Sequence, residues 1–140
     1  MKNIITLFIS ALFLVSCGNS KKENDSNKNI IDVKTIIGKT ESEIEKILGK
    51  AENSEKKFYQ KNKFEIVFID GKSDWITINN ISNFDFNSEN ITLLGLSSTV
   101  PSFENTTSIN WNDIEKINEV IFVSNGENKI EYIYIKAYTK

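Results

Sequence analysis

The chain contains no histidine, and its only cysteine is Cys17. Without histidine it lacks the usual general base near neutral pH, the commonest metal ligand and every Ser-His or Cys-His catalytic pair. A single cysteine allows no intramolecular disulfide, and the isolated glycines form no phosphate-binding loop. We therefore expect a protein that is not an enzyme and that binds no metal or cofactor.

Arginine is also absent, so every basic residue is a lysine, and the 17 lysines are slightly outnumbered by 19 acidic residues. No basic patch with interleaved aromatic residues occurs, and we expect no nucleic-acid binding. The plentiful carboxylates leave a hydrolase with a carboxylate pair formally open. None of them lies in an apolar stretch that would raise its pKa, which is typical of solvated surface charge.

The first seventeen residues have the layout of a secretory signal. Lys2 precedes an apolar run over residues 4–15, and the small residue Ser16 precedes Cys17. The run is too short to span a bilayer as a permanent helix. The sequence Leu14-Val15-Ser16-Cys17 resembles the bacterial lipobox, at which signal peptidase II cuts before a cysteine that has received a diacylglyceryl group. The resemblance implies that residues 1–16 are removed and that lipid on Cys17 anchors the mature protein in a membrane of the cell envelope.

The residue after the cysteine is Gly18 rather than the Asp that resembles an inner-membrane retention signal, which favours the outer membrane. Residues 18–29 contain no apolar side chain and predict a disordered tether with a reach of about 20 Å. Residues 21–25 also resemble the Lys-plus-acid signals that export some outer-membrane lipoproteins to the cell exterior. The alternative interpretation of this tract is a solvated spacer that carries no export signal.

The sequence of residues 30–140 predicts a single α+β domain in which one pattern occurs twice. Residues 42–49 and 88–95 each have the pattern of a short helix that ends at a glycine. A hairpin follows each helix, and the turns are Asp70-Gly71 and Asn125-Gly126, which tolerate positive φ. The sequence thus predicts two tandem helix-plus-hairpin units, about 30–81 and 82–140, that form one antiparallel sheet with the helices on one face. The second unit carries an insertion, expected as a loop over residues 97–113.

The alternation of the strands predicts which side chains face the helices. When the two hairpins are aligned by their turn glycines, the expected core consists of Phe64, Ile66, Phe68, Ile76, Ile78, Ile121, Val123, Ile133 and Ile135. The opposite face is expected to carry Glu65, Val67, Trp75, Thr77, Asn79, Val120, Phe122, Ile130, Tyr132 and Tyr134. Phe84 and Phe86 are expected at the junction of the units, and Phe58 and Tyr59 in an edge strand guarded by lysines.

Residues 37–51, Ile-Gly-Lys-Thr-Glu-Ser-Glu-Ile-Glu-Lys-Ile-Leu-Gly-Lys-Ala, resemble the opening of the SmpA/OmlA-type small lipoproteins. The pattern is Gly, a small residue, an acid, an apolar helix face and then Leu-Gly, usually followed by Pro, where this chain has Ala51. The wider group includes the β-lactamase-inhibitor-protein-like fold with two tandem helix-plus-sheet units. The resemblance implies an α+β protein of the cell envelope that works by binding another protein, and it transfers no functional residue.

Trp75, Phe122, Tyr132 and Tyr134 are candidate partner-binding residues, because aromatic side chains are enriched at the centres of protein interfaces. The alternative is that aromatic residues simply favour strands and that the 97–113 loop, with Phe103 and Trp111, covers them. We therefore expect a lipid-anchored protein-binding or scaffold lipoprotein. A lipid-anchored inhibitor or immunity-type protein that binds a hydrolase or toxin is the second hypothesis.

Overall fold

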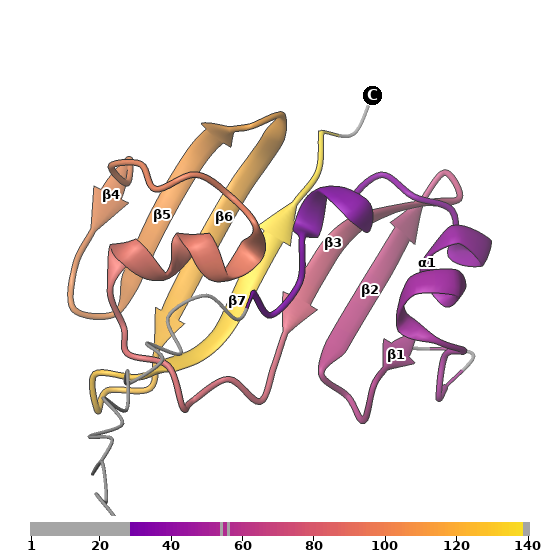
Figure 1. Cartoon of the computed structure of the whole chain (residues 1–140), viewed down its shortest axis with the longest axis horizontal. Helices are drawn as coiled ribbons and strands as arrows, with labels where there is room; N and C mark the ends of the chain where they lie inside the picture. Colours follow the sequence, from indigo (N-terminus) through magenta and orange to yellow (C-terminus); the bar gives the residue numbers. More distant parts are fainter. Residues whose placement is uncertain (1–28, 54, 56, 139–140) are drawn as a thin grey trace, which may run out of the picture.

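The structure is a computed structural model that describes residues 29–53, 55 and 57–138 (Figure 1). The expected signal peptide, the expected lipidation site Cys17 and the expected tether up to residue 28 lie outside the described residues. The described part forms one antiparallel sheet of seven strands with short helices, which is an α+β fold.

The strands lie side by side in the order β1-β2-β3-β7-β6-β5-β4. Their bounds are β1 Phe58–Tyr59, β2 Phe64–Ile69, β3 Lys72–Ile78, β4 Phe103–Glu104, β5 Ser108–Ile114, β6 Ile117–Ser124 and β7 Ile130–Lys136. The two-residue strands β1 and β4 stand at the edges, and β3 and β7 meet at the centre. Three short helices lie on one face of this sheet, namely η1 Val33–Thr35, α1 Glu41–Leu48 and η2 Ser88–Leu94 (Figure 1).

Both expected helices are present, and their ends follow from local capping. Thr40 and Glu43 form a capping box at the start of α1, in which each side chain accepts a hydrogen bond from the backbone N–H of the other residue. The second helix, η2, is a 3₁₀ helix that begins after Asn87 and ends at Gly95. Gly95 has φ +70°, and a Cβ there would stand 3.0 Å from the Cα of Asp32, so the position requires glycine.

The two expected turns differ in length. Asp70 and Gly71 have φ values of 51° and 75° and join β2 to β3 as a two-residue turn, which confirms the first hairpin. Between β6 and β7 the connection spans residues 125–129, and the N–H of Asn125 donates to the carbonyl of Lys129. The Asn125-Gly126 sequence is therefore part of a five-residue loop.

The expectation of a loop over residues 97–113 is wrong. Residues 103–104 form β4, and β5 begins at Ser108 and continues to Ile114, where a two-residue turn leads into β6. The turn residues Glu115 and Lys116 have φ values of 47° and 72°. Neither residue type favours positive φ, so the sequence gives no turn signal at this point.

The face assignment of β6 is also wrong, and with it the placement of Phe122. The register pairs Val120 with Ile135 and Phe122 with Ile133, and all four side chains are buried under the helices. Ile121 and Val123 lie on the opposite face, against Tyr134 and Tyr132. Because the second turn is longer than the first and the register shifts between Val123 and Ser124, alignment by the glycines inverts the alternation.

The remainder of the expected core is confirmed. Phe64, Ile66, Ile76, Ile78, Ile133 and Ile135 are buried, and Phe68, Phe84 and Phe86 are partly buried against them. Trp111 joins the core from β5, and its ring meets that of Phe122 edge-on at a centroid distance of 5.0 Å. Ile130, expected on the outer face, is buried as well. Phe58 and Tyr59 form the expected edge strand β1.

Candidate protein-binding face

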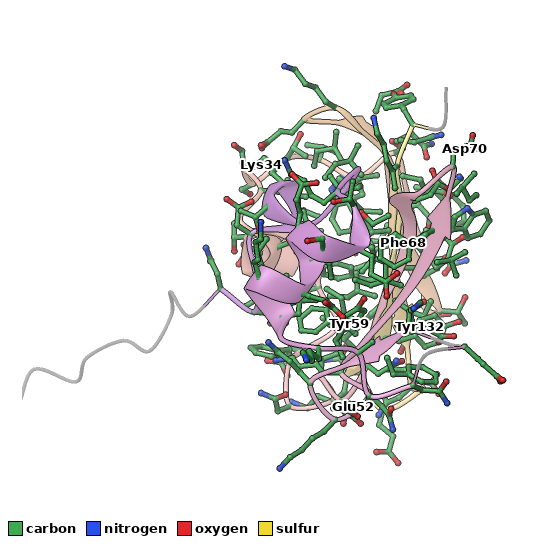
Figure 2. All side chains as sticks on the ribbon, turned by 90° about the vertical axis from the view of Figure 1, so that its right-hand side faces the viewer. Lys34, Glu52, Tyr59, Phe68, Asp70 and Tyr132 are labelled. Carbon is green, nitrogen blue, oxygen red and sulfur yellow. The ribbon has the colours of Figure 1, made fainter. Side chains whose placement is uncertain are left out.

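The candidate site is the face of the sheet that points away from the helices, here called the open face. Figure 2 views the sheet edge-on, with Tyr59 between α1 and the sheet and Tyr132 on the other side. No other element of the described chain lies over the side that carries Tyr132 (Figures 1 and 2). The central side chains of the open face are Val67, Trp75, Thr77, Ile121, Val123, Tyr132, Tyr134 and Lys136.

The register brings three of the four candidate residues together on the open face. Trp75 pairs with Lys136 and Thr77 with Tyr134 across β3 and β7, and Tyr132 follows on the same face of β7. The rings of Trp75 and Tyr134 meet edge-on at 5.1 Å between centroids. Trp75 is 40% exposed, so this aromatic cluster remains accessible. Phe122, the fourth candidate, is buried in the core and does not belong to the face.

A β-bulge supplies the one buried carboxylate beside this cluster. Val67 pairs with Trp75 and Phe68 with Ser73, which leaves Asp74 as the extra residue of β3. The Asp74 side chain is 3% exposed and forms an ion pair with the ammonium of Lys136. The same ammonium lies 4.7 Å from the centre of the Trp75 ring, within reach of a cation–π interaction. The bulge thus fixes a carboxylate, an ammonium and an indole at the junction of β3 and β7.

Burial raises the pKa of Tyr134 to about 12, with a further contribution from the carboxylates of Glu119 and Asp74. Its hydroxyl is buried and has no hydrogen-bond partner among the described residues. Tyr134 is therefore a neutral phenol at physiological pH.

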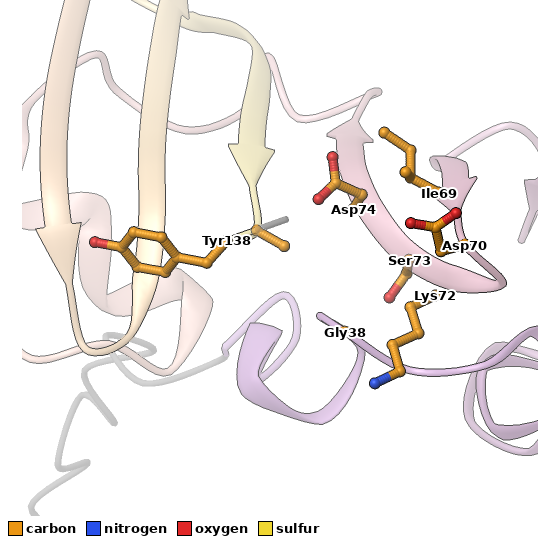
Figure 3. A pocket seen from close by; sticks show the side chains of 8 residues that line it. Gly38, Ile69, Asp70, Lys72, Ser73, Asp74 and Tyr138 are labelled. Carbon is orange, nitrogen blue, oxygen red and sulfur yellow. The ribbon is translucent and has the colours of Figure 1, made fainter. Parts of the chain in front are cut away.

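A pocket of about 450 Å³ lies at the end of the β2–β3 hairpin, next to Gly38 in the segment before α1 (Figure 3). Its lining includes Ser73 and Asp74, whose polar side chains are buried. Ser73 donates to the carbonyl of Ile36 and accepts from the N–H of Lys39 at 3.0 Å, which holds the segment before α1 against β3. The Ser73 hydroxyl and the Asp74 carboxylate thus both have partners within the fold.

Within the described ranges no group of three or more His, Cys, Asp or Glu side chains stands close enough to hold a metal ion. The sequence reasoning placed Ile121 and Val123 on the helix side, and it did not single out Lys136 on the open face or the buried Asp74 beside it. The burial of Asp74 depends on the bulge in β3, and the placement of Ile121 and Val123 depends on the length of the β6–β7 loop. Neither feature has a signal in the sequence.

Comparisons of the chain with protein-family models, with curated proteins and with solved structures give no match. The SmpA/OmlA resemblance therefore rests on residues 37–51 alone. No helix among the described residues is long and apolar enough to cross a membrane.

Proposed function

We propose that this chain is a lipid-anchored protein-binding module of the bacterial cell envelope, and that its open face is the surface that contacts the partner. The observation that carries the proposal is the uncovered aromatic cluster of Trp75, Tyr132 and Tyr134 on an otherwise packed sheet. An antiparallel sheet with helices on one side normally presents polar side chains on the other. Here the centre of that side is aromatic and aliphatic, as at the centre of a protein interface.

The surroundings of the cluster also fit recognition rather than catalysis. Val67 is 49% exposed beside Trp75, and Ile121 and Val123 extend the apolar surface toward β5. Side chains fixed by ring contacts and an ion pair lose little conformational entropy on binding. Because Trp75 is held by Tyr134 and Lys136, it has the properties of a pre-organised anchor residue.

The anchor part of the proposal rests on Cys17 and the apolar run before it. A protein carrying two or more acyl chains stays bound to a bilayer, because each buried methylene contributes about 0.8 kcal/mol. We propose the outer membrane, with the domain either in the periplasm or at the cell exterior.

We further propose that the fold consists of two tandem units, residues 30–81 and 82–140. The strand order supports this, since β1-β2-β3 and β5-β6-β7 are antiparallel meanders that meet through β3 and β7. A short helix precedes each meander, α1 in the first and η2 in the second. The open face would then lie across the junction of the two units.

The test is a crosslinking pull-down from intact cells with the native chain and with the Cys17→Ala, Trp75→Ala and Tyr132→Ala variants. We expect at least tenfold lower recovery of the partner with either aromatic variant. The matched control is Ile47→Ala, which removes a 45%-exposed apolar side chain from α1, on the helix side of the sheet. Unchanged recovery with both aromatic variants would refute the role of the open face. Unchanged recovery with Cys17→Ala would refute the need for the anchor.

A further inference from the structure

The most exposed large apolar side chain of the described residues lies on the segment that connects η2 to β4. Val100 is 87% exposed, and Phe103, three residues later, is 53% exposed. We call residues 97–103 the Val100 loop. Both side chains thus present apolar area to solvent within a short stretch of chain.

Hydrogen bonds hold this loop at both ends. At its start the N–H of Ser97 donates to a carboxylate oxygen of Glu115 at 2.7 Å. In its middle the indole N–H of the buried Trp111 donates to the carbonyl of Thr99 at 3.1 Å. At its end the N–H of Ser102 donates to the carbonyl of Asn110 at 2.8 Å. The loop is thus fastened to β5 and to the β5–β6 turn, and Val100 projects between the fixed points.

The only proline of the chain, Pro101, follows Val100 directly. A residue before proline is restricted to extended conformations, and proline itself has a fixed φ. The backbone around Val100 is therefore pre-organised as an extended segment, which lowers the entropy lost when a partner binds it.

Negative charge predominates around the loop. Glu104 follows Phe103, and Asp113 lines the same hollow as Val100, a space of about 420 Å³ between the loop and the end of β5. Both carboxylates are exposed, and neither has an ion pair within the described residues. Glu115, in contrast, is paired with Lys34 at 3.0 Å. Residues 97–119 contain four carboxylates and one lysine, so a partner that covers Val100 must also accommodate negative charge.

We propose that the Val100 loop is a second contact surface, which inserts as an extended segment into an apolar pocket of a protein whose rim carries Lys or Arg side chains. Val100 fills the pocket, and Glu104 and Asp113 face the basic rim. The apolar contact slows dissociation, whereas the carboxylates speed association and make the rate depend on salt. This surface is distinct from the Trp75 cluster, and the argument for it does not depend on that cluster.

The test places a photo-crosslinking amino acid at position 100 of the full-length chain in intact cells, with parallel chains carrying it at positions 75 and 47. We expect a protein adduct from position 100 and none from position 47, which is 45% exposed on α1. We expect the peptide captured from the partner to combine apolar residues with an excess of Lys or Arg. An adduct from position 75 alone would overturn the inference and leave the open-face proposal standing. No adduct from either position would count against both.

The captured partner then permits a binding measurement with purified proteins. We expect Val100→Ser to raise Kd at least tenfold, mainly through faster dissociation. Glu104→Gln combined with Asp113→Asn should slow association at low salt several-fold and reduce its salt dependence. Thermal unfolding of each variant serves as the folding control, because all three side chains are exposed. A Kd that is unchanged in Val100→Ser, or association that is faster in the carboxylate variant, would contradict the inference.

Discussion

The ion pair between Asp74 and Lys136 leads to a quantitative prediction about the centre of the sheet. Lys136→Met removes the ammonium but keeps the length of the side chain, and it leaves the Asp74 carboxylate 3% exposed without its cation. Removal of one partner from a buried pair costs about 3–5 kcal/mol. Lys136 also contacts the Trp75 ring, and loss of that contact adds about 0.5–1 kcal/mol. Since domains of this size are stable by about 5–15 kcal/mol, the variant should lose a large part of its free energy of unfolding.

Replacement of Asp74 should lower the free energy of unfolding by less than replacement of Lys136, because the Lys136 side chain is the more exposed of the two. Asp74→Asn leaves the Lys136 ammonium, whose side chain is 18% exposed and can extend toward solvent, and we expect a cost of about 1–2 kcal/mol. In the double variant no charge is left buried, so its cost should lie below the sum of the single costs by about 2 kcal/mol or more.

Urea unfolding of the wild type, both single variants and the double variant measures these quantities. The reasoning fails if Lys136→Met costs less than Asp74→Asn, or if the coupling in the cycle is below about 0.5 kcal/mol. Either result would mean that the carboxylate is solvated in solution and that the bulge does not bury it.

Three further predictions concern stability. Phe122→Ala should lower the free energy of unfolding by about 3–5 kcal/mol, because the Phe122 ring is fully buried against Trp111. Trp75→Ala should lower it by only about 1–2 kcal/mol, because Trp75 is partly exposed. Equal losses for the two variants in chemical denaturation would contradict the face assignment. The N–H of Ser97 and the ammonium of Lys34 hold the pKa of Glu115 at about 2. The ionised carboxylate should therefore contribute about 1 kcal/mol to the free energy of unfolding above pH 4.5, and this contribution should be lost as the pH falls toward 2. Glu115→Gln should therefore differ from the wild type in urea unfolding at pH 7 and converge with it near pH 2; a difference that persists there would refute the assignment. Lys116→Gly should raise the free energy of unfolding by about 0.5 kcal/mol, because Lys116 has a φ of 72°, which strains any residue except glycine. The control Lys50→Gly should lower it. Stabilisation by both variants would contradict the argument from strain.

The parts of the fold that could be predicted from the sequence are those set by local chemistry. Asp70-Gly71 marks a tight turn because both residues accept positive φ, and the residues around α1 carry a capping box. The β5–β6 turn could not be predicted, because Glu115 and Lys116 have no such preference. Hydrogen bonds from Ser97 and Lys34 to the Glu115 carboxylate stabilise this turn from other parts of the chain. A local sequence pattern does not reveal hydrogen bonds from such distant residues. Because it therefore does not indicate the turn, it predicts a loop where the structure has β5.

The composition of the open face was predictable only in part, for a related reason. Trp75 and Tyr134 follow the alternation of their own strands, so their placement needed no knowledge of the loops. Phe122 was misplaced because its assignment depended on counting residues across the β6–β7 connection, where one residue of error exchanges the faces. The burial of Asp74 likewise depends on a β-bulge that no pattern in the sequence predicts.

The arrangement at the junction of β3 and β7 has a consequence for how the proposed function is tested. Trp75 lies on the open face, and it also contacts Tyr134 and Lys136, which belong to the neighbouring hairpin. Its replacement therefore changes the packing of the sheet together with the exposed surface. Tyr132 lies on the same face but takes part in neither of these contacts, so Tyr132→Ala separates binding from stability more cleanly. If Tyr132→Ala abolishes partner recovery at an unchanged melting temperature, the loss belongs to the surface itself. If only Trp75→Ala does so, with a lowered melting temperature, the aromatic cluster serves to join the two hairpins.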